Sequence, residues 1–236
     1  MYSIPGLNEI KIYSINFKAF SREIISLQDN LIPHEVKIAG KFKFEEDCSR
    51  YIIARSYLRK ILGDYLSIDP IDVKISLNKF GKPTLLSENF ESIKFNLSHS
   101  GDFIVYAFNI SDEVGIDIEM MNNYIDHTQI AENYFSSDEI IYLNSSKDQL
   151  EITERFFRIW TRKEALLKAI GTGLLPDLRK IDVLRNEIKL DLSPDELPEY
   201  QTRNFNVLDF SIHNNYKSSI ACAGEKKRIM IEQINF

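Results

Sequence analysis

The stretch Val114-Gly115-Ile116-Asp117-Ile118-Glu119 lies near the middle of the 236-residue chain and predicts a strand that continues to Met120. Side chains alternate across a strand, so its aliphatic residues share one face and Asp117 and Glu119 share the other. Two such carboxylates repel each other unless water or a cation lies between them, and oxygen ligands of this kind suit Mg²⁺. An ordinary strand with one solvated face explains the same pattern, so both interpretations stay open at this point.

Helix and strand patterns alternate on both sides of this segment. A buried strand is predicted from Phe103 to Ile110. Apolar residues recur with a helical period from Glu45 to Leu62 and again from Ile152 to Ile170, and Gly63 and Gly171 are predicted to end these helices. The other predicted strands are Ile10–Phe17, Pro70–Leu77, Phe95–Leu97, Ile181–Val183, Glu187–Leu192, Phe205–Ile212 and Tyr216–Ala223. The pattern indicates an α+β fold of two helix-plus-sheet halves that meet near residues 115–125.

The composition excludes several classes of protein. Lys and Arg number 29 against 35 Asp and Glu, and a net charge of −6 argues against a protein that coats nucleic acid. The longest apolar run, Phe103 to Phe108, is far shorter than the ~20 residues of a membrane helix. Cys48 and Cys222 cannot build a disulfide framework or a zinc site. We therefore expect a cytoplasmic protein without a nucleic-acid or membrane partner.

Two further segments carry residues suited to chemistry. Glu164 and Lys168 are four positions apart in the second predicted helix and so share a face. An exposed Glu–Lys pair is the common explanation, and the alternative gives Glu164 to a metal or a proton and Lys168 to a phosphate. His99 lies in the predicted turn Ser98-His99-Ser100-Gly101, where hydroxyls and backbone N–H groups could cradle an anion. A single histidine in a turn more often has no such role.

Four motifs in order change this balance: Gly81-Lys82-Pro83, FNLSHSG at residues 95–101, GIDIE at residues 115–119 and WTRKEALLKAIGTGL at residues 160–174. The set resembles the 4′-phosphopantetheinyl transferases, in particular the longer pseudo-dimeric class typified by the surfactin-synthetase activator. The resemblance implies transfer of the 4′-phosphopantetheine arm of coenzyme A to a serine hydroxyl of an apo acyl or peptidyl carrier protein, with release of adenosine 3′,5′-bisphosphate. It also implies a monomer of two similar halves, residues 1–118 and 119–236, with the active site at their interface.

The resemblance assigns roles to individual residues. Asp117, Glu119 and Glu164 match the ligands of Mg²⁺, for which Mn²⁺ is an alternative. Glu164 is the candidate to take the serine proton, and with Asp117, Lys168 and His99 it forms the catalytic set that the resemblance implies. The matched coenzyme A contacts are Lys82, Pro83, Ser98, His99, Lys168, Arg50 and the weaker candidate Lys163.

Other positions fit the resemblance less well. Glu139 matches an acidic position near the metal, but Ser136-x-x-Glu139 also spells a capping box, which we favour. Glu35 and Ile38 stand where basic residues tend to meet the 3′-phosphate, with three lysines nearby. A carrier-docking surface is expected between residues 124 and 143. The residues that motivate this surface are Tyr124, Ile130, Tyr134 and Phe135.

Two other functions use the same residues. A Mg²⁺-dependent phosphohydrolase could position water with the three carboxylates and His99, but the chain lacks the additional aspartates and histidines of two-metal phosphatases. A catalytically silent binder of carrier protein or coenzyme A would retain the fold, and the loss of a carboxylate would have supported it. All three carboxylates are present, so a transferase is the predicted function.

Overall fold

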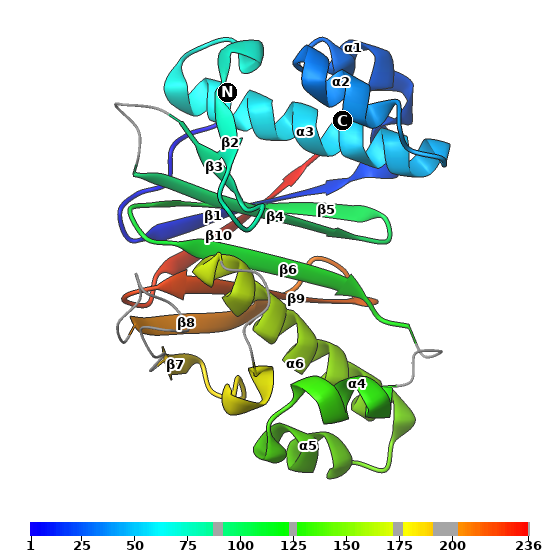
Figure 1. Ribbon diagram of the computed structural model, residues 1–236, viewed down its shortest axis with the longest axis vertical. Coiled ribbons are helices and arrows are strands. Elements are labelled where there is room, and N and C mark those ends of the chain that lie inside the picture. Colours follow the sequence, from blue (N-terminus) through cyan, green and yellow to red (C-terminus); the bar gives the residue numbers. More distant parts are fainter. Residues whose placement is uncertain (87–91, 123–126, 172–176, 191–202, 236) are drawn as a thin grey trace.

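The computed structural model describes residues 1–86, 92–122, 127–171, 177–190 and 203–235 (Figure 1). Two four-stranded sheets lie between two long helices, α3 (Glu45–Leu66) and α6 (Gln149–Ile170). The first sheet has the order β10 (Arg228–Ile234), β1 (Glu9–Asn16), β5 (Phe103–Ile110) and β4 (Ile93–Ser100). The second has the order β6 (Val114–Met120), β9 (Tyr216–Ala223), β8 (Arg203–Phe210) and β7 (Glu187–Leu190). The predicted α+β class is confirmed.

Shorter elements flank these layers. The short helices are α1 (Ile24–Gln28), α2 (Pro33–Ala39), α4 (His127–Tyr134) and α5 (Ser137–Asn144), with 3₁₀ turns at Phe17–Glu23, Pro70–Asp72 and Leu178–Lys180. A two-stranded ribbon joins β2 (Ile75–Leu77) to β3 (Pro83–Leu85). Within the described ranges, no helix is both long enough and apolar enough to cross a membrane.

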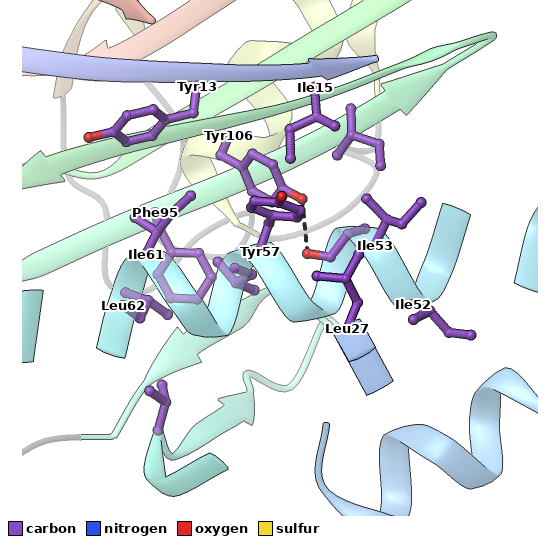
Figure 2. Close-up of a cluster of buried hydrophobic side chains, with 14 of the residues drawn as sticks. Tyr13, Ile15, Leu27, Ile52, Ile53, Tyr57, Ile61, Leu62, Phe95 and Tyr106 are labelled. Atoms are coloured by element: carbon purple, nitrogen blue, oxygen red, sulfur yellow. Dashed lines mark hydrogen bonds between the residues drawn. The ribbon is translucent and has the colours of Figure 1, made fainter. Parts of the chain in front are cut away.

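Three apolar layers hold the sheets and helices together. The first lies between α3 and the first sheet, where the hydroxyl of Tyr106 donates a hydrogen bond of 2.9 Å to the carbonyl of Ala54 (Figure 2). The second lies between the two sheets and includes Ile12 and Ile116. The third lies between α6 and the second sheet. The aliphatic face of β6 is therefore buried between the sheets, and its carboxylate face is turned toward α6.

Each half contains a long helix of the same length and a buried ion pair in the same place. Both long helices have 22 residues, and they begin 104 positions apart, at residues 45 and 149. Glu35 pairs with Arg59 of α3, and Glu139 pairs with Lys163 of α6, with 24 positions between the partners in each pair. Each cation also donates to backbone carbonyls of the segment that follows its helix. The similarity of the two halves thus extends to the polar groups inside each one.

The strands do not follow a simple division of the chain. β6 already belongs to the second sheet, and β10 at the far end of the chain pairs in parallel with β1 of the first. β10 was not predicted from the sequence, because its apolar residues Ile229, Met230, Ile231 and Ile234 do not alternate with polar ones. The predicted boundary between the two halves, at residues 118 and 119, falls within β6 and stays a prediction.

Several predicted boundaries are wrong. Gly63 lies inside α3, which ends at Leu66 with Ser67 in the left-handed region at φ 56°. Residues 70–74 precede the short strand β2 instead of forming part of it, and no strand is assigned at residues 181–183. β4 continues to Ser100, so His99 lies in a strand rather than in a turn.

Gly115 lets α6 pack directly on β6. A Cβ at this position would overlap the backbone carbonyl oxygen of Ala165 and the backbone nitrogen of Ala169. Rigid backbone lies on both sides of this contact, so neither partner can move without separating the helix from the sheet. The glycine of the GIDIE motif therefore sets the depth at which α6 lies above the carboxylate face of β6.

Replacement of Gly115 by Ala is expected to lower the free energy of unfolding by about 3 kcal/mol, the upper part of the range for overpacking. Urea denaturation followed by circular dichroism measures the change. Gly40→Ala is the matched control, because its Cβ meets no atom closer than 3.7 Å and φ is −68°. Equal stability of the Gly115→Ala variant and the wild type would contradict the assigned close contact.

Candidate active site at the seam between the sheets

The site lies where β4, at one edge of the first sheet, meets β6, at one edge of the second. Side chains of β4 take the place of a neighbouring strand. Asn96 Oδ1 accepts a hydrogen bond of 3.0 Å from the backbone N–H of Ile116, and Ser100 Oγ accepts one of 3.0 Å from the N–H of Met120. This polar seam fixes the register between the two sheets.

The same seam holds the carboxylates of the GIDIE motif. Ser98 Oγ donates to Asp117 Oδ1 at 2.9 Å, and Ser100 Oγ donates to Glu119 Oε2 at 2.8 Å. Lys168 of α6 contacts the first of these pairs, with its Nζ 2.6 Å from Asp117 Oδ1 and 2.9 Å from Ser98 Oγ. The structure therefore brings together residues of three motifs that are far apart in the sequence.

Asp117 has one satisfied oxygen and one unsatisfied oxygen. The residue is 2% exposed, and Oδ2 is buried without a hydrogen-bond partner. Burial raises the pKa of Asp117, and the ammonium group of Lys168 opposes this rise. Most buried polar atoms in proteins have a partner, so the free oxygen indicates a position suited to a ligand.

Glu119 and Glu164 complete the acidic cluster. Burial, followed by repulsion from Asp117, raises the pKa of Glu119 to about 7. Burial and the charge of Asp117 also raise the pKa of Glu164, and in the described part of the chain its carboxylate has no hydrogen-bond or ion-pair partner. Three carboxylates that disfavour one another's charge form an environment that a cation would stabilise.

These residues fit Mg²⁺ by their chemistry. The donor set consists of carboxylate oxygens only, and it includes the free Oδ2 of Asp117. Among the described residues, no three His, Cys, Asp or Glu side chains stand in an arrangement that could hold a metal ion as they are. The side chains of Asp117, Glu119 and Glu164 would therefore have to shift to share one ion.

His99 and Arg50 lie on the other side of β4. Side chains alternate along the strand, so His99 faces α3 whereas Ser98 faces β6. Partial removal of the His99 ring from water, together with the positive charges of Arg50 and Lys168, lowers its pKa. The guanidinium group of Arg50 pairs with Asp47 at 2.9 Å and with Glu46 at 3.0 Å. Arg50 of α3, His99 of β4 and Lys168 of α6 thus form a row of basic residues across the edge of β4.

Lys163 and Lys82 lie away from this cluster. Lys163 is 1% exposed, and its Nζ contacts Glu139 at 2.8 Å and the carbonyls of Leu178 and Ile181. An ammonium group has three N–H donors, so Lys163 has none left for coenzyme A. This placement contradicts its predicted role as a nucleotide contact.

Lys82 joins three segments of the protein. Its Nζ donates to Glu113 Oε2 at 2.7 Å and to the carbonyls of Val114 and Ala169 at 3.3 and 3.2 Å. Pro83 begins β3, opposite Leu77 of β2. In this structure the GKP turn thus ties the ribbon to the start of β6 and the end of α6, with no Lys82 donor left for a nucleotide.

Two acidic residues outside the cluster have structural roles. The Glu139 carboxylate accepts from the backbone N–H of Ser136 at 2.7 Å and from that of Val183 at 2.8 Å, which confirms the predicted capping box. Glu35 is buried against Arg59, with 2.6 Å between the carboxylate and Nε. This pairing gives Glu35 a structural role at a position where the resemblance suggested a phosphate contact.

The expected docking surface divides into buried and exposed residues. Phe135 is 1% exposed within the third apolar layer, so it cannot contact a partner directly. Tyr134 is 37% exposed and stands edge-on against Trp160, at 5.8 Å between ring centroids. Ile130 packs partly against the same layer, and Tyr124 lies outside the described residues.

Ser100 and Asn96 were not singled out as site residues from the sequence. Ser98 and Ser100 are two positions apart, as are Asp117 and Glu119, and both hydrogen bonds join residues 19 positions apart. This matched spacing is a signal in the sequence. It becomes visible only when residues 98–100 are assigned to a strand and not to a turn.

Comparison with known proteins covers both halves of the chain. A model described as the 4′-phosphopantetheinyl transferase superfamily matches residues 113–223, and one described as 4′-phosphopantetheinyl transferase, N-terminal, matches residues 16–111. The 4′-phosphopantetheinyl transferase HetI of Nostoc sp. is 33% identical over 92% of this chain and 89% of its own length. Two Bacillus subtilis relatives of the same description are ffp, 30% identical over 78% of both chains, and Sfp, 27% identical over 81% of both.

Replacement of Lys163 by Met is expected to lower the free energy of unfolding by about 3 kcal/mol, because it leaves the buried Glu139 charge without its partner. Urea denaturation measures the loss, and the double variant with Glu139→Gln should recover part of it. The exposed Lys147→Met is the control, with an expected change within about 0.5 kcal/mol. A stable Lys163→Met variant with weakened coenzyme A binding would show that Lys163 contacts the nucleotide.

Proposed function

The chain belongs to the 4′-phosphopantetheinyl transferase superfamily, and we propose that Asp117, Glu119 and Glu164 form its catalytic centre. The enzyme transfers the phosphopantetheine arm of coenzyme A to a carrier protein. The observation that carries the site assignment is the buried, unpartnered Oδ2 of Asp117, whose other oxygen pairs with Lys168 and whose charge raises the pKa values of Glu119 and Glu164.

The reaction is a phosphoryl transfer. The serine hydroxyl of the carrier attacks the phosphorus that bears the pantetheine arm, and the bridging P–O bond of the coenzyme A pyrophosphate breaks. Adenosine 3′,5′-bisphosphate leaves with the bond electrons, and the serine proton passes to a base. Because little covalent chemistry falls to the protein, its residues act mainly by positioning the reactants and stabilising charge.

We assign Mg²⁺ to the three carboxylates, with Mn²⁺ as the alternative ion. When bound, the metal supplies positive charge that offsets the negative charge developing on the pyrophosphate oxygens. Asp117 would contribute its free Oδ2, and Glu119 its Oε1, because Ser98 and Ser100 already bond to the other oxygens. Glu164 would complete the set from α6.

Glu164 is also our candidate for the base. Its carboxylate is partly buried and has no partner among the described residues, and burial raises its pKa toward the range useful for proton transfer at neutral pH. Lys168 has two N–H groups on Asp117 and Ser98, and its third can meet a phosphate oxygen. His99 and Arg50 would bind the phosphates from the side of α3.

The structure also bears on the oligomeric state and the cellular location of the enzyme. One chain supplies both halves and both edges of the seam, so we propose that the enzyme works as a monomer. Cys48 and Cys222 are free thiols, which is consistent with a reducing cytoplasm.

Incubation of an apo carrier protein with this enzyme, coenzyme A and Mg²⁺ should add the mass of one phosphopantetheine to the carrier, as read by intact-mass spectrometry. EDTA should abolish the gain. Asp117→Asn should lower the rate at least a hundredfold, because the neutral amide leaves two of the three carboxylates for the metal. The Gly40→Ala variant is the matched control and should retain the wild-type rate. A full rate in EDTA would overturn the metal assignment, and a full rate for Asp117→Asn would overturn the site.

Tyr134 provides a test of the carrier-docking surface. It stands against Trp160, which lies one turn before Glu164 on α6, so its exposed ring borders the proposed centre. Tyr134→Ala is expected to raise the KM for the carrier several-fold, with the KM for coenzyme A unchanged. Ile25→Ala, at an 84% exposed position on α1, is the control. An unchanged carrier KM would exclude Tyr134 from the docking surface.

A further inference from the structure

Two serines of β4 stand opposite two carboxylates of β6 in matching positions. Ser98 Oγ lies 2.9 Å from Asp117 Oδ1, and Ser100 Oγ lies 2.8 Å from Glu119 Oε2. Each hydroxyl holds one oxygen of its carboxylate and leaves the other oxygen without a serine partner. The resemblance placed Ser98 among the coenzyme A contacts, whereas the hydrogen bonds point toward the metal ligands.

The bonding capacity of Ser98 argues against a phosphate contact. A hydroxyl has one O–H to donate, and a phosphate oxygen can only accept at neutral pH. The single proton of Ser98 is directed at Asp117, and the oxygen accepts from Lys168 Nζ at 2.9 Å. The residue is 7% exposed and faces β6, away from His99 and Arg50.

Ser100 repeats this arrangement one step further along the strand. It donates to Glu119 and accepts from the backbone N–H of Met120, so its orientation is fixed from both sides. Because the acceptor contact is to backbone, the hydroxyl cannot rotate away without leaving an N–H of β6 unpaired. Both serines therefore sit on a regular strand with both bonding directions in use.

We propose that Ser98 and Ser100 are positioning residues for the metal ligands, an inference that rests on the proposed function. Each serine fixes one carboxylate oxygen and so directs the other, Asp117 Oδ2 or Glu119 Oε1, toward the metal. Groups that orient ligands in this way typically contribute ten- to a hundredfold to metal affinity. The serines need not touch coenzyme A or the carrier.

Mn²⁺ binding tests the proposal without catalysis. The decrease of the free Mn²⁺ signal in electron paramagnetic resonance is recorded for the full chain, with Mn²⁺ alone and again with coenzyme A present. Ser98→Ala and Ser100→Ala are each expected to weaken Mn²⁺ binding about tenfold, as is typical for the loss of such an orienting contact. Ser100→Thr retains the hydroxyl at a half-buried position and should restore most of the affinity.

Ser218→Ala is the matched control. Ser218 is 3% exposed on β9 and donates to the carbonyl of Phe210, so its loss removes a buried hydroxyl without affecting the carboxylates. Its Mn²⁺ affinity should equal that of the wild type. Circular dichroism confirms that each variant is folded before titration.

The outcomes distinguish failure of the positioning role from failure of the metal site. Wild-type affinity in both Ser98→Ala and Ser100→Ala would overturn the positioning role while leaving the metal site in place. A Ser98→Ala variant that loses coenzyme A binding in EDTA and keeps its Mn²⁺ affinity would make Ser98 a phosphate contact. Failure of the wild type to bind Mn²⁺ under either condition would overturn the metal site, and the positioning role with it.

Discussion

The structure depends on how the edge of β6 is closed. This strand has β9 on one side only, and on the other side Asn96 and Ser100 of β4 accept from its backbone N–H groups. Unpaired backbone groups at a buried edge are costly, so the polar residues of β4 stabilise the contact between the two sheets. The same side chains place serine hydroxyls beside the carboxylates of β6. The contact that joins the halves is therefore also the contact that builds the site.

Pseudo-symmetry explains why Lys163 is structural although it lies in a motif. Glu35–Arg59 and Glu139–Lys163 occupy equivalent places in the two halves, and each pair fastens a short helix to a long one and to the segment that follows it. All three N–H donors of Lys163 are used inside the protein, and Arg59 is 1% exposed, so neither cation is placed to bind a substrate. Lys168 differs because it lies at the seam, where its ammonium group contacts Asp117 of β6. Its side chain is 30% exposed. We therefore assign the reaction to Lys168 because it lies at the seam, and not because it belongs to a motif.

The sequence predicted the parts of the fold that depend on local pattern. β5 and β6 have the predicted bounds, β5 from its unbroken apolar run and β6 from its alternation, and α6 ends at Ile170 with Gly171 as its C-cap. It could not predict β10, whose partner β1 is more than 200 positions away and whose apolar residues do not alternate with polar ones. The assignment of residues 98–101 to a turn concealed the opposite orientations of Ser98 and His99. Lys163 was placed near the site although helical spacing turns it about 100° from Glu164.

The electrostatics of the seam support the proposal that it binds a cation. Burial raises the pKa values of Asp117, Glu119 and Glu164, and the charge of Asp117 raises those of the two glutamates further. The ammonium group of Lys168 pairs directly with Asp117 alone. An unpaired buried oxygen such as Asp117 Oδ2 costs about 1–3 kcal/mol. The fold holds this unfavourable arrangement because the carboxylates of β6 are fixed by β4 hydroxyls and by the backbone of a strand packed on both faces. A divalent ion would bind the free oxygen and neutralise the excess negative charge. Relief of the unfavourable arrangement in the metal-free protein would therefore add to the free energy of metal binding.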